Sequence, residues 1–208
     1  MLKDGIKDGM SPWMNRITRV TDFSISLVCL IVFSPLFLIC YLGIKWEDGG
    51  ETIFKQERIG QGGKPFYIYK FRTMQAESEK GGLPQLCSNS QSDERLLRFG
   101  QFLRNHHLDE LPQLWNVFVG DMAFVGPRPE RAYFIQQIMK RDERYALLYQ
   151  IKPGVTSYAT LYNGYTDTIE KMLRRLELDL YYLQHRSFAL NIKILFSTFW
   201  RIISGKIF

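Results

Sequence analysis

The chain has few of the residues that build disulfide frameworks or metal centres. It contains three cysteines and three histidines among its 208 residues. Cys29 and Cys40 lie in an apolar run and Cys87 lies in a polar stretch. The odd number and the spacing argue against a disulfide framework and against a zinc site. The polar part of the chain is therefore expected to lie in the cytosol.

The composition also lacks the signs of disorder and of repeat architecture. Hydrophobic residues make up 46% of the chain, which is typical of a globular protein, and no segment repeats. The length fits one domain of ordinary size. The net charge of +6 suits phosphorylated substrates, anionic lipid headgroups and nucleic acid equally well.

One segment lacks charge altogether, from Phe23 to Ile44. As a straight helix it would be about 33 Å long, enough for the hydrocarbon core of a bilayer. It is too long for a secretory signal, and no small-residue cleavage site follows it. A buried helix of a soluble protein usually shows a polar stripe, whereas this segment has only Ser24, Ser26, Ser34 and Tyr41. We therefore predict that it enters a membrane.

Whether the segment crosses the membrane is a separate question. Ser34-Pro35 lies in its middle, where proline removes a backbone hydrogen bond. The residues fit a kinked spanning helix and a re-entrant helix that returns to its own side equally well. Basic residues flank both ends, so the positive-inside rule favours neither orientation; they are Arg16, Arg19, Lys45, Lys55 and Arg58.

The remaining sequence predicts a mostly helical α+β fold. Residues 52–58 and 65–71 are rich in aromatic and β-branched residues and flank a glycine-rich turn, which indicates a β-hairpin. Helical patterns cover residues 93–104, 111–119, 129–150, 167–186 and 188–203. Residues 1–12 are predicted to form a polar lead-in, and residues 77–93 a mobile loop. The last helix, 188–203, is either a core helix with a basic edge or a helix that lies in the membrane interface.

Two adjacent carboxylates, Asp109 and Glu110, precede Pro112. Proline is tolerated in the first turn of a helix, so both acids are predicted at a helix N-terminus, beside free backbone N–H groups. There an aspartate stays ionised, as a nucleophile or a Mg²⁺ ligand must. The alternative is an ordinary acidic helix start.

Arg128 stands between Pro127 and Pro129. Its backbone is fixed on both sides, which preorganises the guanidinium for a phosphate group; the alternative is a structural arginine in a turn. Lys70 and Arg72 follow the hairpin, and Arg104 lies just before Asp109. Taken one at a time, these three are typical solvated charges.

These motifs resemble one known family. They are the Ser34-Pro35 segment and residues 53–74, 98–129, 151–159 and 177–187, which together cover nearly the whole chain. In this order they are similar to the bacterial sugar transferases, monotopic phosphoglycosyl transferases that act on polyprenol phosphate. The chain resembles the minimal form of that family, without additional membrane helices or an N-terminal domain.

The resemblance implies that a phospho-sugar passes from a UDP-sugar to undecaprenyl phosphate. Asp109 would be the nucleophile and form a phospho-sugar ester, with release of UMP. Glu110 would help to hold Mg²⁺ or handle a proton, and Asp109 and Glu110 would together be the metal ligands. Arg128 would bind the diphosphate, with Lys70, Arg72 and Arg104 completing the substrate site.

The resemblance also implies a location and an organisation. Residues 1–22 would be a lead-in at the membrane surface, residues 23–44 a re-entrant helix broken at Ser34-Pro35, and residues 45–208 a catalytic domain with interfacial helices. The protein would act at the cytoplasmic face of the bacterial inner membrane, in contact with membrane lipid. Downstream glycosyltransferases are possible partners.

Some positions depart from the family pattern. His106-His107 precedes the acidic pair where a small residue is usual, residues 155–162 lack the common glycine and glutamine, and Asn191 replaces a frequent aspartate. The first two departures bear on sugar preference. Two other classes of protein fit the sequence less well. A non-catalytic membrane adaptor would not need Asp109, Glu110 and Arg128 together, and a nucleic-acid binder would need a basic aromatic platform in place of the apolar segment.

Overall fold

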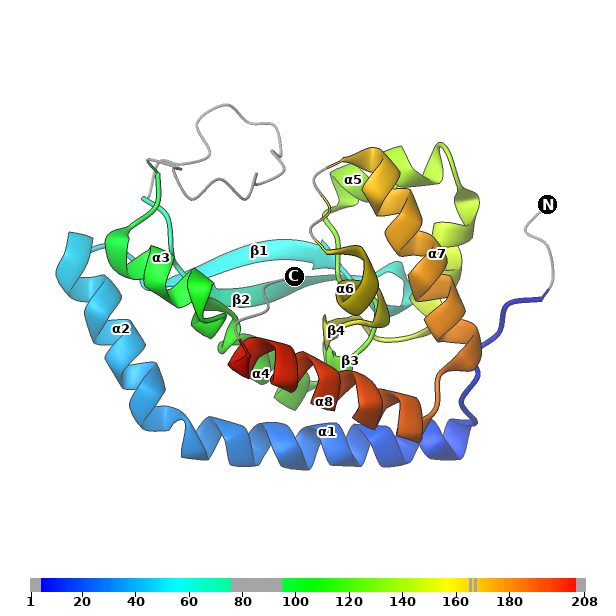
Figure 1. Cartoon of the computed structure of the whole chain (residues 1–208), viewed down its shortest axis with the longest axis horizontal. Coiled ribbons are helices and arrows are strands. Elements are labelled where there is room, and N and C mark those ends of the chain that lie inside the picture. Colours follow the sequence, from blue (N-terminus) through cyan, green and yellow to red (C-terminus); the bar gives the residue numbers. More distant parts are fainter. Residues whose placement is uncertain (1–4, 76–94, 165, 167, 205–208) are drawn as a thin grey trace.

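The computed structural model describes residues 5–75, 95–164, 166 and 168–204. The predicted class is confirmed: the fold is α+β, mostly helical, with a small antiparallel hairpin. Figure 1 shows two long N-terminal helices framing the rest of the chain along one edge and one side. The predicted loop over residues 77–93 and Cys87 lie outside the described residues.

The apolar segment forms two helices that meet at a bend. Helix α1 spans Pro12–Val32 and helix α2 spans Ser34–Asp48, and the pair is bent by 60°. The break falls where the Ser34-Pro35 motif predicted it, with Pro35 in the first turn of α2. No single helix of the described residues is long and apolar enough to cross a membrane, whereas α1 and α2 together meet that requirement.

The predicted hairpin is confirmed almost to the residue. Strand β1 spans Ile53–Ile59 and pairs antiparallel with β2, Pro65–Phe71. The glycine-rich connection forms a single 3-10 turn in which Gly62 and Gly63 have φ values of 70° and 71°. Only glycine adopts this left-handed conformation without steric cost, which explains the residue choice.

A second small sheet was not predicted. Strands β3 (Ala123–Val125) and β4 (Gly154–Thr156) pair in parallel. A Cβ atom on Gly154 would lie 2.1 Å from the backbone nitrogen of Gly126. The two backbone segments can approach this closely only because glycine has no Cβ atom. The Gly154 N–H donates to the Pro127 carbonyl at 2.9 Å. The sheet thereby fixes the start of the Pro-Arg-Pro element.

Most of the predicted helices are present, as α3 (Arg98–Asn105), α4 (Gln113–Val119), α7 (Ile169–His185) and α8 (Phe188–Ile203). The single helix predicted over residues 129–150 is wrong. Asp142 is extended, and its carboxylate caps the N–H of Arg144 at 2.9 Å. The segment is thereby divided into α5 (Ala132–Met139) and a 3-10 segment, Glu143–Gln150. Helix α6 (Tyr158–Asn163) was not predicted and begins at the Ser157 cap.

The main core forms around α7, whose inner side chains Met172, Leu176, Leu180 and Leu183 are buried. They pack with side chains of α5, α8 and the 3-10 segment that precedes β4. A second cluster joins α2 to β2 and α3 through Cys40, Ile44, Phe71, Leu97 and Leu103. The bent pair is therefore part of the packed structure, and α2 contributes directly to a core.

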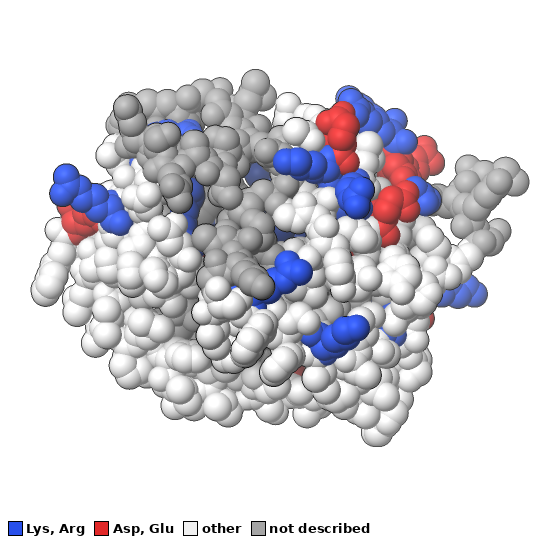
Figure 2. All heavy atoms as spheres, in the orientation of Figure 1, with Lys and Arg blue, Asp and Glu red and all other residues white. Residues whose placement is uncertain are grey.

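The opposite sides of the long helices carry exposed apolar side chains. Soluble proteins rarely expose contiguous apolar patches on this scale, and such surfaces mark binding sites. Figure 2 shows the lower part of the molecule, where α1 and α8 lie, as an almost uncharged surface. The exposed residues include Trp13, Val20, Phe23, Val28, Ile31 and Val32 of α1, Leu38, Ile39 and Trp46 of α2, and Ile192, Phe196, Phe199, Trp200 and Ile203 of α8.

The core also contains a carboxyl group that lacks full hydrogen bonding. Asp179 of α7 is only 2% exposed, and its Oδ1 has no hydrogen-bond partner among the described residues. Burial raises its pKa from the ordinary 3.8 to about 7, although Arg175 opposes the shift. Since the folded state holds the proton more tightly than the unfolded state, stability contributed by the protonated group is lost as pH rises through 7.

We therefore expect Asp179→Asn to stabilise the protein at pH 8, because the neutral amide avoids the cost of a buried charge. The gain in unfolding free energy should be about 1–3 kcal/mol and should disappear near pH 4. Thermal unfolding at a series of pH values measures it. Glu170→Gln, at an exposed site on the same helix, is the matched control and should show no such dependence. A destabilised Asp179→Asn at pH 8 would contradict the prediction.

Candidate active site

The two predicted acids lie on a turn of their own between two helices. Leu108–Glu110 forms a single 3-10 turn, and α4 begins only at Gln113, with Pro112 at its N-cap. The prediction that Asp109 and Glu110 occupy the first turn of that helix is therefore corrected. The chain enters the turn through His107, which has φ 55° and ψ 19°. This left-handed residue separates α3 from the 3-10 turn.

Glu110 lies between two cations. Its Oε1 accepts hydrogen bonds from Lys70 Nζ at 2.5 Å and from Arg128 Nη2 at 3.3 Å. Burial alone would raise the pKa of Glu110, but Lys70 and Arg128 outweigh it and hold the pKa well below its usual range. Glu110 is therefore a permanent carboxylate that holds both cations in place.

Asp109 has a different environment from its neighbour. Burial raises its pKa, Lys70 and Arg104 act in the opposite direction, and the charge of Glu110 adds to the increase. The described residues provide no hydrogen bond to its half-buried carboxylate. The expectation that backbone N–H groups keep Asp109 ionised is thus replaced by a balance between burial and nearby cations. A carboxylate that is poorly solvated and not hydrogen-bonded is suited to nucleophilic attack or to metal binding.

A buried asparagine positions Lys70. Lys70 is next to last in β2, and Asn116 of α4 is fully buried against that strand. Its Oδ1 accepts the Tyr69 N–H at 3.1 Å and its Nδ2 donates to the Tyr67 carbonyl at 2.7 Å. The side chain therefore replaces a neighbouring strand. Sequence reasoning missed Asn116, although an asparagine among apolar residues on the inner face of a helix is a usable signal.

A second residue missed from the sequence, Glu130, holds the Pro-Arg-Pro element. Its carboxylate is 5% exposed and pairs with Arg175 at 2.6 Å and with Arg58 at 3.2 Å. Arg58 also donates to the Pro129 carbonyl at 3.1 Å, and the Ile59 N–H donates to the Glu130 carbonyl at 3.0 Å. The residue that follows the Pro-Arg-Pro element is thereby tied to β1 and to α7. The backbone that carries Arg128 is therefore held by these contacts as well as by its two prolines.

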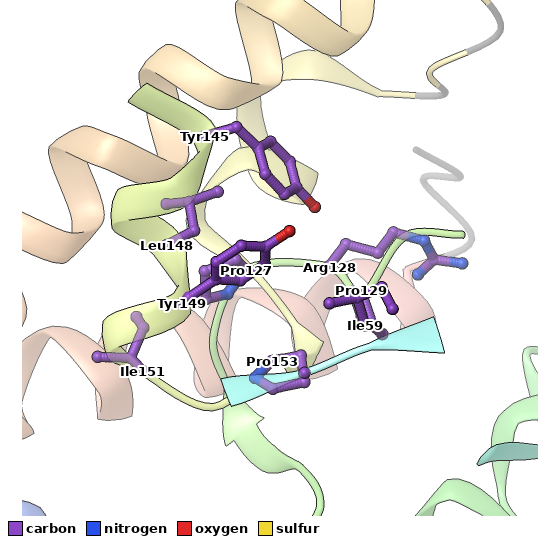
Figure 3. A pocket seen from close by; sticks show the side chains of 10 residues that line it. Ile59, Pro127, Arg128, Pro129, Tyr145, Leu148, Tyr149, Ile151 and Pro153 are labelled. Carbon is purple, nitrogen blue, oxygen red and sulfur yellow. The ribbon is translucent and has the colours of Figure 1, made fainter. Parts of the chain in front are cut away.

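The hollow behind the Pro-Arg-Pro element is too small for a substrate. It measures about 20 Å³, space for roughly one water molecule. Figure 3 shows Tyr145 and Tyr149 beside it, while the guanidinium of Arg128 points away from Tyr149 and Pro153. The side chain of Arg128 as a whole is 41% exposed, and its Nη2 contacts Glu110. The N–H groups of Arg128 thus lie toward the acidic pair and not toward this hollow.

The other two predicted basic residues have different partners. Arg72 is buried and forms an ion pair with Asp48 at the end of α2. Arg104 Nε donates to Thr73 Oγ1 at 2.8 Å, and its charge lowers the pKa of Asp109. Of the four predicted substrate-binding residues, Lys70 and Arg128 are thus brought together on Glu110, and Arg104 lies within electrostatic reach of Asp109. For Arg72, the contact to Asp48 indicates a structural role, and substrate binding stays a prediction.

The acidic pair fits the ligand set expected for magnesium. No group of three or more His, Cys, Asp or Glu side chains with metal-site geometry occurs in the part of the chain that the structure describes. Mg²⁺ is commonly held by only one or two carboxylates, together with water and substrate phosphates. The Asp109 carboxylate has no hydrogen bond to a residue that the structure describes, and Glu110 has a second oxygen besides the Oε1 that binds Lys70 and Arg128. These two residues are the candidate ligands.

Comparison with known proteins identifies the family. The family model of bacterial sugar transferases matches residues 13–205. The chain belongs to the bacterial sugar transferase family. This result confirms the resemblance seen in the motifs, and the match includes the bent helix pair, the acidic pair and the Pro-Arg-Pro element.

Several relatives have names that state an activity. A UDP-glucose:undecaprenyl-phosphate glucose-1-phosphate transferase of Klebsiella pneumoniae is 38% identical over 190 residues, 90% of this chain and 40% of the relative. An Aeromonas hydrophila UDP-N-acetylgalactosamine-undecaprenyl-phosphate N-acetylgalactosaminephosphotransferase is 35% identical over 195 residues, which are 94% of this chain and 45% of the relative. The chain thus spans less than half the length of these two family members. The uncharacterized sugar transferase EpsL of Bacillus subtilis is 35% identical over 191 residues, 91% and 89%.

Proposed function

We propose that the protein is a phosphoglycosyl transferase that moves a phospho-sugar from a UDP-sugar to undecaprenyl phosphate. The observation that carries the proposal is the environment of Asp109. A half-buried carboxylate that receives no hydrogen bond from the described residues lies beside Glu110, which holds Lys70 and Arg128. The names of the two longer relatives, which state this type of reaction, support the same conclusion.

In the proposed first step, an Asp109 oxygen attacks the phosphorus that carries the sugar. The bond between this phosphorus and the bridging oxygen breaks, and UMP leaves with that oxygen and its electron pair. The product is a phospho-sugar ester on Asp109. Attack on a diphosphate by an anion requires its charge to be neutralised, and Lys70 and Arg128 provide two cations for this purpose.

In the second step, a phosphate oxygen of undecaprenyl phosphate attacks the same phosphorus. The bond to the Asp109 oxygen breaks, a new diphosphate forms on the lipid, and the free carboxylate is restored. A covalent intermediate lets one small site serve the soluble donor and the lipid acceptor in turn. Asp109 and Glu110 would hold Mg²⁺, which when bound supplies positive charge to the phosphate oxygens.

We also propose that α1 and α2 enter the membrane and return on the cytoplasmic side. Both ends of the pair are held by the same domain. Arg19 of α1 donates to the carbonyls of Val117 and Phe118 at 2.6 and 2.8 Å. At the far end of α2, the Glu47 carboxylate accepts hydrogen bonds from the N–H groups of Arg98 and Phe99 at 2.6 and 3.1 Å. These two residues begin α3.

A spanning helix would put these two ends on opposite sides of the bilayer, about 30 Å apart in depth. The 60° bend and the exposed apolar side chains of α1, α2 and α8 support the re-entrant arrangement. The acidic pair then lies in the domain that faces the cytoplasm of the bacterial inner membrane. This arrangement gives the site access to both a soluble donor and a lipid acceptor.

The first test concerns covalent catalysis. We expect the purified protein with a UDP-sugar and Mg²⁺ to release UMP without lipid and to gain the mass of a sugar phosphate on the peptide that contains Asp109. Intact-protein and peptide mass spectrometry measure both. Asp109→Asn removes the attacking oxygen anion and should form no adduct. The neighbouring Glu110→Gln should turn over slowly but keep the attacking group. An adduct that persists in Asp109→Asn, or UMP release that requires lipid in the wild type, would contradict the mechanism.

The second test separates charge from geometry at Arg128. We expect Arg128→Lys to lose activity on the order of 100-fold, because an ammonium cannot donate in parallel to two oxygens of a diphosphate. UMP release is the measurement, with thermal unfolding as the check of folding. Arg141→Lys, at an exposed ion pair with Glu170, is the matched control. Near-normal turnover of Arg128→Lys would show that Arg128 only shapes the turn.

The third test concerns topology. Single cysteines placed before Arg16, and others after α2, should react equally with an impermeant thiol reagent applied from the cytoplasmic side. Replacing Ser34 and Pro35 with leucine should favour a straight helix and move the N-terminal label to the other side. Protection of the N-terminal cysteine in the otherwise unchanged chain would rule out the re-entrant arrangement.

A further inference from the structure

Two buried carboxylates lie close to one arginine behind the Pro-Arg-Pro element. Glu130 and Asp179 are 5% and 2% exposed. Arg175 Nη2 donates to Glu130 Oε1 at 2.6 Å, and its Nη1 donates to Thr166 Oγ1 at 2.7 Å. Asp179 follows Arg175 by four residues on α7, the spacing at which side chains of one helix face meet. Its Oδ1 nevertheless has no hydrogen-bond partner among the described residues.

Asp179 is influenced by charged groups from several elements. Burial opposes its ionisation most strongly, Glu130 also opposes it, and Arg175 favours it. Tyr145 of the 3-10 segment lies near enough for Asp179 to raise the pKa of its hydroxyl group. Arg58 of β1 pairs with the second oxygen of Glu130 at 3.2 Å. No ionisable group of α5, α6 or α8 in the described part of the chain contributes to the shift in the pKa of Asp179.

Ionisation of Asp179 changes the choice of partners open to Arg175. A buried carboxylate with an unpaired oxygen is stabilised by a guanidinium within reach, and Arg175 is the cation that acts on Asp179. Arg175 is already bound to Glu130. Two anions then compete for one guanidinium and repel each other. Glu130 keeps its contact with Arg58 but is held less firmly on the side of α7.

The position of Glu130 affects Arg128. Glu130 directly follows the Pro-Arg-Pro element, and its charge raises the pKa of Arg128, so the two side chains lie within electrostatic reach. Arg128 Nη2 reaches Glu110 at 3.3 Å, near the upper end of hydrogen-bonding distances. A small displacement of the backbone that carries Arg128 is therefore enough to break this contact.

We propose that Asp179 is a positioning residue for the reaction, and that its protonated form leaves Arg175 on Glu130 and so keeps Arg128 directed at the acidic pair. Ionised Asp179 draws Arg175 away from Glu130, and the donor diphosphate is then bound less well. Asp179 acts only through Arg175 and Glu130. The inference rests on the function proposed above and adds a control of donor binding by pH.

The rate of UMP release at a series of UDP-sugar concentrations, from about pH 6 to about pH 9, tests this proposal. In the wild type, the KM for the donor should rise on the order of tenfold across this range, while kcat changes less. Asp179→Asn cannot ionise and should keep a low KM throughout. Glu177→Gln removes a carboxylate from the exposed side of the same helix, where it pairs with Arg144, and should show the same rise as the wild type.

A second variant covers the case in which Asp179→Asn folds poorly. Thr166→Val frees Arg175 Nη1 for Asp179, so the rise in KM should begin at a lower pH. The residual activity of Arg128→Lys should show no rise, because the positioned group is absent. A KM independent of pH in the wild type, a rise that persists in Asp179→Asn, or an unchanged rise in Thr166→Val or Arg128→Lys would overturn the proposal. Lack of the Asp109 adduct at every pH would instead contradict the proposed function, so the two failures are distinguishable.

Discussion

The contact on which the site depends is the carboxylate of Glu110 between Lys70 and Arg128. These three residues come from the 3-10 turn, from the end of the hairpin and from the Pro-Arg-Pro element. Two cations in a partly buried position would repel each other, and the shared anion makes their approach favourable. The same contact leaves Asp109 as the carboxylate of the pair that accepts no hydrogen bond within the described part of the chain. One acid thus has a structural role that sets the chemistry of its neighbour.

Each partner of Glu110 is held in turn by a buried polar group. Asn116 fixes the backbone at Tyr67 and Tyr69, just before Lys70. Glu130, which directly follows the Pro-Arg-Pro element, pairs with Arg58 and Arg175. Buried ion pairs seldom add much net stability, because desolvation offsets their attraction. Their geometry is nevertheless well defined. We infer that Asn116 and Glu130, with the arginines that pair with Glu130, serve to position Lys70 and Arg128. Apolar packing alone would fix the positions of these two side chains less well.

The bent helix pair connects the site to its surroundings. Arg19 and Glu47 hold its two ends on helices α4 and α3, which flank the 3-10 turn of the acidic pair. The bend and the position of the site are therefore set by the same packing. An exposed apolar surface on α1, α2 and α8 follows, because the inner sides of these helices are used for contacts within the domain.

Local patterns in the sequence determined those parts of the protein that depend on near neighbours. The hairpin follows from two runs of aromatic and β-branched residues around a glycine-rich turn, the helix break from Ser34-Pro35, and family membership from motifs in a fixed order. The same reasoning failed over residues 129–150, where helical periodicity continues through Asp142 although that side chain caps a new turn. It also placed the acids at the N-terminus of a helix, because Pro112 fits a first turn as well as an N-cap.

Only the tertiary structure decided which charges meet. The sequence named Lys70, Arg72, Arg104 and Arg128 as substrate-binding candidates. The fold directs Arg72 to Asp48 and Arg104 to Thr73, and brings Lys70 and Arg128 to Glu110. Glu130 and Asn116 gained their roles in the same way. Ion pairs and burial depend on residues far apart in the chain, so no local pattern encodes them. Spacing along the sequence therefore named the candidates, and packing assigned their partners.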